Sequence, residues 1–152
     1  MVGADQSAGM VEQARVNHPE VRFEQIGLQE LAFEGEFDAA ICIDAMEHVP
    51  PEDWPRVLTN LRRALRPGGH LHLTVEEVVD RNELDRAFAE ARAAGLPVRH
   101  GEDAREGTGG YHYYPDRDQV RIWLTETGST LLDESDERID DYGYYHLLVL
   151  AP

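Results

Sequence analysis

Residues 37–43 read Phe-Asp-Ala-Ala-Ile-Cys-Ile, and residues 65–75 read Leu-Arg-Pro-Gly-Gly-His-Leu-His-Leu-Thr-Val. The first run is nearly all apolar, which is typical of a strand buried on both faces of a parallel sheet. The second contains a Pro-Gly-Gly turn and then alternates from His70 to Val75, as a strand does. Between them, apolar residues recur at helical spacing from Trp54 to Leu65, and we expect Pro50-Pro51 to open that helix. A strand, a helix and a strand in this order favour an α/β fold.

The residues before this unit predict two more strands and a helix. Val2 to Asp5 form a short apolar run that ends in an acid. Ser7 is a good N-cap residue, and His18-Pro19 ends the helix that we expect after it. Residues 21–26 alternate between apolar and polar side chains, which predicts a strand.

The residues after this unit predict two helices and a closing pair of strands. Asp80 has capping-box spacing to Glu83 for the first helix, and Asp116 caps the second. We expect a long loop at 98–115 because that stretch is polar and rich in glycine.

The last two strands are expected at 130–137 and 144–150, joined by a polar turn at Asp140-Asp141. Because this connection is short, the final strand is predicted to be antiparallel. The alternation of elements therefore predicts one α/β domain, residues 1–152, with a mainly parallel sheet.

Composition narrows the functional classes. The chain has 152 residues, 41% of them hydrophobic, which suits one globular domain. Its formal net charge of -16 repels phosphate backbones and argues against a nucleic-acid partner. No run approaches the ~20 apolar residues of a membrane span, so we expect no membrane partner and a cytoplasmic location. Cys42 is the single cysteine, and its apolar surroundings indicate a buried structural thiol.

Four segments, in order and spacing, resemble class I S-adenosylmethionine-dependent methyltransferases, especially the small-molecule branch often called type 11. The match is good from about residue 2 to 79 and thin from 110 to 152. The four segments are Val2-Gly3-Ala4-Asp5-Gln6-Ser7 with Met10, Leu31-Ala32-Phe33 with Phe37-Asp38, Asp44-Ala45-Met46-Glu47-His48-Val49, and Leu65-Arg66-Pro67-Gly68-Gly69-His70-Leu71.

The resemblance implies a Rossmann-like sheet with helices on both faces, S-adenosyl-L-methionine as cofactor and a small-molecule methyl acceptor. Asp5, with Gln6 beside it, would accept hydrogen bonds from the ribose hydroxyls, as acids at strand ends do in dinucleotide-binding folds. The alternative is that Asp5 caps the following helix. Met10 would contact the adenine, or else pack in the core.

The family usually has an acid for the adenine amine at the position that Gly27 occupies here. The backbone N–H of Leu28 and the amide of Gln29 are then the remaining candidates at the adenine. Ile43 and Asp44 would flank the sulfonium and the methionine part, because open α/β sheets bind ligands at the ends of their strands.

Asp44, Glu47 and His48 are spaced i, i+3, i+4 and would share one face if the chain turned helical there. This spacing resembles the Glu-x-x-Glu-His of ubiquinone-pathway O-methyltransferases, which binds a divalent metal. The Glu-His pair is also widespread in methyltransferases that use no metal, and we assign no metal ligand. His48 is the candidate general base, and a structural role is its alternative.

A second candidate region lies farther along the chain. Residues 107–114 contain Gly109-Gly110 and the cluster His112, Tyr113 and Tyr114. In the family this region forms much of the substrate pocket. The three rings either line that pocket or pack against the last strands.

The family's first strand and its glycine-rich cofactor loop have no counterpart here, since no G-x-G-x-G occurs in the sequence. In the family order 3-2-1-4-5-7-6 that strand is central, and without it two strands keep unpaired edges. We expect the sequence to be a truncated form of a longer chain; the alternatives are that a homodimer partner completes the sheet or that the two strands close up. The expected function is methyl transfer to oxygen, nitrogen or carbon of a small molecule. The alternative is an inactive methyltransferase-like scaffold that acts as a binding module.

Overall fold

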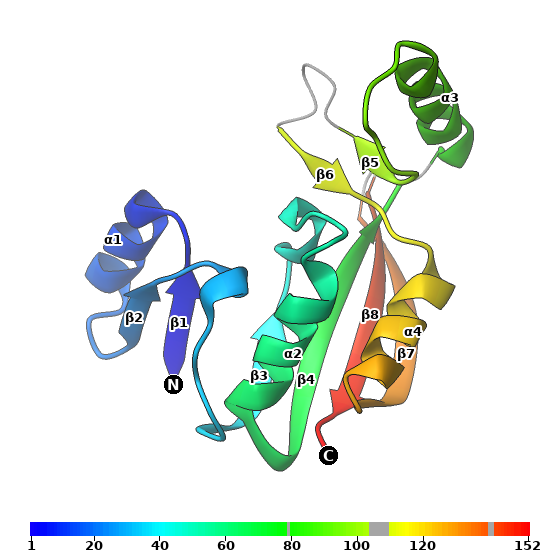
Figure 1. Ribbon diagram of the computed structural model, residues 1–152. Coiled ribbons are helices and arrows are strands. Elements are labelled where there is room, and N and C mark those ends of the chain that lie inside the picture. The colour runs from blue at the N-terminus through cyan, green and yellow to red at the C-terminus, as the bar shows by residue number, and fades with distance from the viewer. Residues whose placement is uncertain (79, 104–109, 140–141) are drawn as a thin grey trace.

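The computed structural model describes residues 1–78, 80–103, 110–139 and 142–152, and its largest sheet has the strand order β3-β4-β8-β7 (Figure 1). These strands are β3 (Phe37–Cys42), β4 (Leu65–Glu77), β7 (Thr130–Ile139) and β8 (Tyr142–Leu150). β3 and β4 are parallel, and β8 is antiparallel to both β4 and β7. The predicted α/β fold with an antiparallel C-terminal strand is confirmed. The predicted turn at Asp140-Asp141 lies outside the described residues.

A second, smaller sheet consists of β1 (Val2–Asp5) and β2 (Arg22–Gln25), which are parallel. Helix α1 (Ala8–Asn17) connects them, and Ser7 Oγ caps it by accepting from the backbone N–H of Met10 at 3.4 Å. Figure 1 shows β1 on the side of the pair nearer to β3. Among the described residues β1 and β3 are not paired with each other, so of the three alternatives the closing up of these two strands is not observed.

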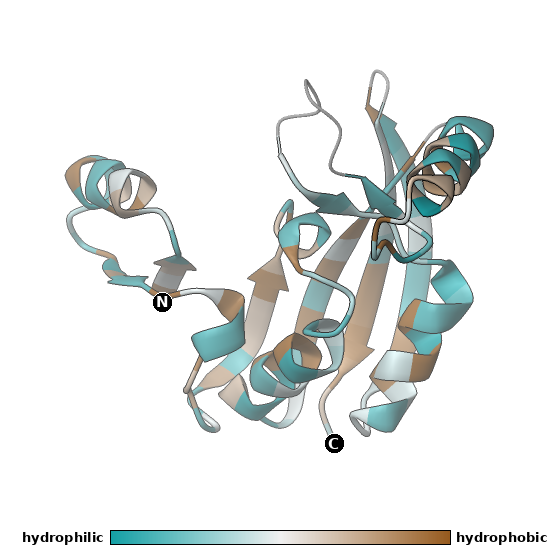
Figure 2. Cartoon of the chain, turned by 45° about the horizontal axis from the view of Figure 1, so that its top comes forward, coloured by the Kyte–Doolittle hydropathy of each residue, from teal (hydrophilic) through white to brown (hydrophobic). Residues whose placement is uncertain are grey.

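Helices α2 (Trp54–Ala64) and α4 (Arg117–Glu126) pack against each other over the large sheet. Figure 2 shows apolar residues concentrated on the strands of this sheet and polar residues on the outer turns of the helices. The prediction that Pro50-Pro51 opens α2 is wrong by one turn. The N–H of Asp53 bonds to Pro50 O at 2.9 Å and closes a turn, and the first helical bond runs from Val57 N to Asp53 O.

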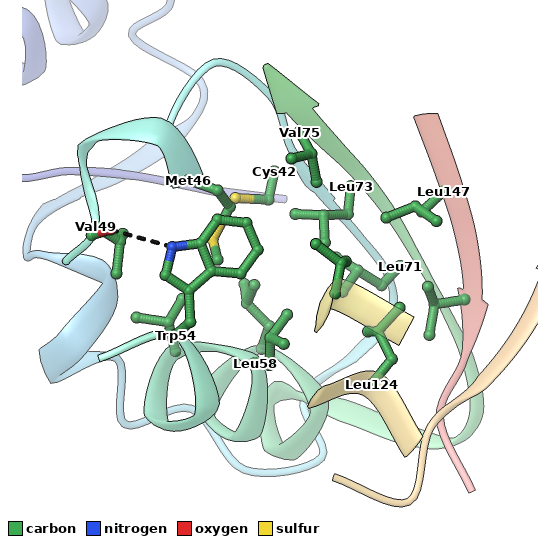
Figure 3. Packing of buried hydrophobic residues seen from close by; sticks show 14 of the residues in the cluster. Cys42, Met46, Val49, Trp54, Leu58, Leu71, Leu73, Val75, Leu124 and Leu147 are labelled. Carbon is green, nitrogen blue, oxygen red and sulfur yellow. Dashed lines mark hydrogen bonds between the residues drawn. The ribbon is translucent and has the colours of Figure 1, made fainter. Parts of the chain in front are cut away.

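The core lies between α2 and strands β4 and β8 (Figure 3). Trp54 is fully buried there, and its Nε1 donates to the carbonyl of Val49 at 3.1 Å. Tyr113 and Trp123 pack on the Trp54 ring, with centroids 6.0 and 5.3 Å away. Cys42 belongs to the same core, where burial and then the charge of Glu47 raise the pKa of its thiol to about 12. The predicted structural thiol is confirmed.

Gly68 and Gly69 hold the C-terminal end of the chain rather than the end of a helix. Helix α2 ends at Ala64, and both glycines lie within β4. The N–H of Gly68 donates to Ala151 O at 3.0 Å, and Gly69 O accepts from Ala151 N at 2.9 Å. Gly68 has a φ of +78°, which a residue without Cβ adopts without strain.

The segment expected as a long loop contains two short strands. β5 (Glu102–Asp103) pairs antiparallel with β6 (His112–Tyr113), and this small sheet follows α3 (Arg81–Ala93). The expected cap of α3 is confirmed, because Asp80 accepts from the backbone N–H groups of Asn82 and Glu83. Residues 107–109, part of the predicted substrate region, lie outside the described residues.

In the part of the chain that the structure describes, none of the helices combines the length and apolarity of a membrane span.

Candidate functional site: a pocket at three strand ends

A pocket of about 310 Å³ lies at the carboxyl ends of β1, β2 and β3. This is where open α/β sheets bind ligands, because the loops that follow parallel strands emerge at one edge. The pocket brings together seven residues predicted from the sequence: Asp5, Gln6, Gly27, Leu28, Gln29, Asp44 and His48. Its lining also includes five that sequence reasoning missed: Ala4, Ser7, Ile26, Ala45 and Val49. Each missed residue is adjacent in the sequence to a predicted one, and this adjacency could have identified it as part of the site.

Two predicted cofactor residues do not line this pocket. Met10 is 61% exposed on α1, where its neighbour Val11 is the buried residue. Successive helical side chains point about 100° apart, so the two cannot face the same way. Ile43 is 48% exposed and follows the buried Cys42 at the end of β3. Alternation along the strand directs these two side chains to opposite faces.

Asp5 forms the first wall of the pocket and also organises the start of α1. Its Oδ1 accepts from the backbone N–H of Ser7 at 2.7 Å. This hydrogen bond agrees with the alternative that Asp5 caps the helix that follows it. A carboxylate has two oxygens and about four acceptor positions, so this bond is compatible with a second role toward ligand hydroxyls.

The second wall is anchored to the body of the molecule by one buried amide. Gly27 precedes the short 3-10 helix η1 (Leu28–Glu30), which follows β2. Asn60 of α2 donates from Nδ2 to the carbonyl oxygens of Leu28 and Gln29, at 3.1 and 3.0 Å. These bonds connect segments more than 30 positions apart in sequence. They hold the backbone groups that the sequence assigned to adenine recognition.

The third wall begins at Asp44, which has an unusual backbone. Its φ is 49°, the only positive φ outside glycine among the described residues. The backbone N–H of Asp44 donates to Thr74 Oγ1 of β4 at 3.2 Å. Non-glycine residues adopt this left-handed conformation at an energetic cost, and such residues are frequent at ligand sites.

The left-handed turn at Asp44 also separates it from the residues that follow. Met46–His48 form the short 3-10 helix η2, which Asp44 precedes. The condition for a shared face of Asp44, Glu47 and His48, a helical turn that includes all three, is therefore not met. Within the described ranges no group of three or more His, Cys, Asp or Glu side chains is arranged to hold a metal ion.

His48 is held in one orientation by a backbone carbonyl. Its Nδ1 lies 3.2 Å from the carbonyl oxygen of Tyr111. A carbonyl only accepts, so Nδ1 carries the proton and Nε2 of the neutral ring has its lone pair free to accept one. Nε2 lies 3.7 Å from Glu47 Oε1. The arrangement of carboxylate and imidazole can accept a proton and stabilise the resulting imidazolium.

Two buried acids lie beside this histidine. Glu47 is 5% exposed, and burial raises the pKa of its carboxyl. Glu76 of β4 is 8% exposed; burial, followed by the charges of Glu47 and Asp44, raises its pKa to about 7. Nothing in the sequence pointed to Glu76, because its proximity to Glu47 depends on the packing of η2 against β4.

The predicted aromatic cluster is divided between two environments. His112 faces the site, since its ring centroid lies 4.9 Å from that of His48. Tyr114 stacks on His112 at 6.0 Å. Tyr113 is buried against Trp54 and Trp123, so packing explains it, but against helices rather than the last strands.

Comparison with known proteins agrees with this geometry. A family model described as a methyltransferase domain matches residues 1–69. Trans-aconitate 2-methyltransferase of Deinococcus radiodurans is 41% identical over 76 residues, which are 49% of this chain and 28% of that protein. A ubiquinone biosynthesis O-methyltransferase of Dechloromonas aromatica is 37% identical over 71 residues, 45% of this chain and 28% of that protein. The chain thus aligns with under a third of the length of these two relatives.

Solved structures extend the likeness over nearly the whole chain. A S-adenosylmethionine-dependent methyltransferase of Methanosarcina mazei superposes with a TM-score of 0.80 at 14% identity, covering 98% of this chain and 80% of that one. The 1,6-didemethyltoxoflavin-N1-methyltransferase of Burkholderia thailandensis, solved with S-adenosylhomocysteine, gives 0.69 at 16%, covering 99% and 60%. Over nearly the whole chain, the fold is therefore similar to that of these methyltransferases. The methyltransferase-domain match covers residues 1–69, the part of the chain that contains every residue of the pocket lining.

Proposed function

We propose that this chain binds S-adenosylmethionine in the pocket at its strand ends and transfers the methyl group to a small molecule. The observation that carries the proposal is the convergence of Asp5, Leu28, Asp44 and His48 on one pocket of about 310 Å³. That volume lies at the lower end of the range of small-molecule sites, ~300–1,000 Å³. Carboxylates and backbone N–H groups are the partners that ribose hydroxyls, an adenine ring and a sulfonium cation need.

Each wall has a separate role in this proposal. Asp5 accepts from the ribose hydroxyls, with Gln6 beside it. The backbone of Gly27 and Leu28 and the side chain of Gln29 receive the adenine. Asp44 provides negative charge near the sulfonium. The roles of Met10 and Ile43 stay predictions, since these residues would have to approach from outside the pocket lining.

When bound, S-adenosylmethionine supplies an activated methyl group on a sulfonium leaving group. The protein's contribution is to hold the acceptor in line with that methyl group and to take up a proton. Nε2 of His48 is the proton acceptor in our proposal, because Tyr111 fixes Nδ1 as the protonated nitrogen. Glu47, with Oε1 3.7 Å from Nε2, then stabilises the imidazolium by its charge.

The acceptor is proposed to be a small molecule. The net charge of -16 opposes a nucleic-acid substrate. Related proteins carry the names trans-aconitate 2-methyltransferase and ubiquinone biosynthesis O-methyltransferase, which both denote small acceptors. We also propose that the chain works in the cytoplasm.

The test is calorimetric titration of S-adenosylmethionine and S-adenosylhomocysteine into the purified chain, with the oligomeric state measured by sedimentation. Micromolar binding is expected, together with a loss of at least ~10-fold in affinity for Asp5→Asn. Asparagine keeps an oxygen for the Ser7 N–H, so this variant removes charge while preserving the turn into α1. Glu12→Gln, an exposed charge change on α1, is the matched control.

Two results would contradict the proposal. The first is no binding of either ligand at millimolar concentration by the folded chain. The second is binding that Asp5→Asn and Glu12→Gln weaken equally, since the effect would then come from overall charge. His48→Gln should leave cofactor affinity unchanged and lower only the rate of methyl transfer. If binding requires a dimer in sedimentation, a second copy contributes to the site.

A further inference from the structure

Two histidines meet on the face of the large sheet that points away from α2 and α4. Leu73 of β4 is buried in the core beneath these helices, so alternation along the strand directs its neighbour His72 to the other face. On β8, His146 lies directly opposite Thr74, which places it diagonally across from His72. Nε2 of His72 is 3.2 Å from Nδ1 of His146, and the two ring planes are 22° apart.

This face of the sheet is open to solvent around the two rings. The register places Ile41 of β3 beside His72 on one side and Leu148 of β8 on the other. Ile41 is 72% exposed and Leu148 is 38% exposed. A small ion with its waters can therefore reach the nitrogens of the pair.

The contact between the rings shows how their lone pairs are directed. A neutral imidazole has one N–H and one lone pair. Two ring nitrogens 3.2 Å apart are therefore joined by a proton on one and a lone pair on the other. A metal ion can take the place of that proton, because neutral imidazole nitrogens are metal ligands.

The separation of the two nitrogens suits a divalent transition metal. Bonds from Zn²⁺ to imidazole nitrogen are about 2.0–2.1 Å, so two nitrogens on one tetrahedral ion lie roughly 3.3–3.4 Å apart. The 3.2 Å of this structure is close to that value. Because χ2 of histidine is soft, small ring rotations turn both lone pairs toward one ion while the strands stay in place.

Glu137 of β7 adds a carboxylate on the far side of the His146 ring. Its Oε2 lies 3.1 Å from Nε2 of His146, yet this buried nitrogen makes no directed hydrogen bond among the described residues. With a metal on Nδ1, the proton of the neutral ring is on Nε2, next to this carboxylate. Carboxylates in that place orient metal-binding histidines and raise their basicity.

We propose that His72 and His146 bind a divalent transition-metal ion such as Zn²⁺ or Cu²⁺, and that Glu137 orients His146. Such ions prefer imidazole nitrogen, whereas Mg²⁺ and Ca²⁺ prefer oxygen. With two protein ligands the ion keeps water in its other positions, so the site does not need the cluster of three or more ligands that the described residues lack. The inference goes beyond the proposed function, because neither histidine lines the pocket at the strand ends.

One threonine connects this site with that pocket. Thr74, opposite His146 in the register, accepts from the backbone N–H of Asp44 at 3.2 Å. An ion that joins β4 to β8 therefore stabilises the strand pair on which Asp44 rests.

The test is titration of ZnCl2 into the purified whole chain, followed by calorimetry and by NMR of the imidazole nitrogens. Micromolar binding is expected, with shifts at Nε2 of His72 and Nδ1 of His146 that Mg²⁺ does not cause. His72→Asn and His146→Asn should each abolish this binding, and Glu137→Gln should weaken it ~10-fold. His18→Asn, at the exposed histidine that ends α1, is the matched control and should bind like the parent protein.

Thermal unfolding gives a second readout. Because the bound ion joins two strands of the folded state, saturating Zn²⁺ should raise the Tm of the parent protein and of His18→Asn. It should leave the Tm of His72→Asn and His146→Asn unchanged.

Equal Zn²⁺ affinity in His72→Asn, His146→Asn and His18→Asn, each folded by circular dichroism, would overturn the inference. So would imidazole shifts confined to His48 and His112, since the ion would then lie beside the pocket. If neither substituted strand folds, the nitrogen shifts of the parent protein decide the question by themselves.

Discussion

Asp44 combines a strained backbone with a place in the pocket. Its φ of 49° is tolerated by aspartate and asparagine and is costly for a β-branched residue. Asp44→Val should lower the free energy of unfolding by about 1–3 kcal/mol. Asp44→Asn should change it by less than about 0.5 kcal/mol, yet weaken S-adenosylmethionine binding, because the charge is lost and the backbone is kept.

Urea unfolding and calorimetry on the same samples separate these effects. Glu126→Val provides a control for β-branching, since Glu126 is exposed on α4 and does not line the pocket. Equal stability of the Asp44 valine and asparagine variants would show that the left-handed backbone imposes no constraint.

Glu76 makes stability depend on pH in a defined direction. Burial, and then the charges of Glu47 and Asp44, raise its pKa from 4.5 to about 7, with His48 acting the opposite way. The folded state therefore binds this proton more tightly than the unfolded state does. Its stabilising contribution is complete below pH 4.5 and is lost as the pH rises through 7.

Glu76→Gln removes this titration. We expect the variant to resemble the parent protein near pH 4 and to exceed it in unfolding free energy by about 1–3 kcal/mol at pH 8. Urea midpoints at several pH values between 4 and 8 measure the difference. Parallel profiles for the two proteins would place the ionisation of Glu76 outside this window. Glu12→Gln should leave the profile unchanged.

At the scale of elements, helix α2 supports the segment that forms one wall of the pocket. Asn60 Nδ2 satisfies the carbonyl oxygens of Leu28 and Gln29 and is itself buried. Asn60→Ala leaves both carbonyls without this donor, so the unfolding free energy should fall by about 1–3 kcal/mol. S-adenosylmethionine affinity should fall as well, because the backbone at η1 loses its anchor.

Thr59→Ala is the matched control, since the Thr59 hydroxyl donates within the helix, to Pro55 O at 2.7 Å. Thermal unfolding and calorimetry measure both quantities. A loss of stability with unchanged cofactor affinity would show that the position of η1 does not depend on this amide.

Helix α2 shows which features of an element can be predicted from its own sequence and which depend on the folded structure. Its apolar stripe from Trp54 to Leu61 is readable from helical spacing, and the buried face agrees with it. Its start was placed too early, because proline favours both turns and first helical turns. The hydrogen bond from Asp53 N to Pro50 O decides between them, and composition does not encode that choice.

At the scale of the whole molecule, the large sheet and the β1-β2 sheet differ in how many of their strands have neighbours on both sides. β4 is paired on both sides, and β8 lies between β4 and β7. β1 and β2 form an isolated pair covered by α1, in which Val11 is the buried side chain. Two-stranded sheets are marginal by themselves, so the free energy of local opening should be lowest there.

Hydrogen exchange tests this expectation. Amides of β4 and β8 should exchange slowest, and those of β1 and β2 faster by at least ~10-fold. Saturating S-adenosylmethionine should slow exchange in β1 and β2 selectively, since the pocket joins their ends to the end of β3. Uniform protection across both sheets, with and without ligand, would contradict the expected difference.

The class of fold and the order of the main helices and strands were readable from the sequence alone, whereas the short strands β5 and β6 were not. Periodicity and caps act over a few residues, so strands such as 37–42 and the cap at Asp80 follow from local chemistry. The acids and glycine that follow β1, β2 and β3 were readable too, because parallel strands end at one edge. Seven of the predicted site residues meet in the pocket for that reason.

Tertiary structure alone decided the contacts between distant segments. Asp44 reaches Thr74 across 30 positions, Asn60 reaches Leu28 across 32, and His48 reaches Tyr111 across 63. The packing of η2 against β4 also brought Glu47 and Glu76 near each other and buried both acids. Burial and register are collective properties of the folded chain, and no pattern within one segment carries them.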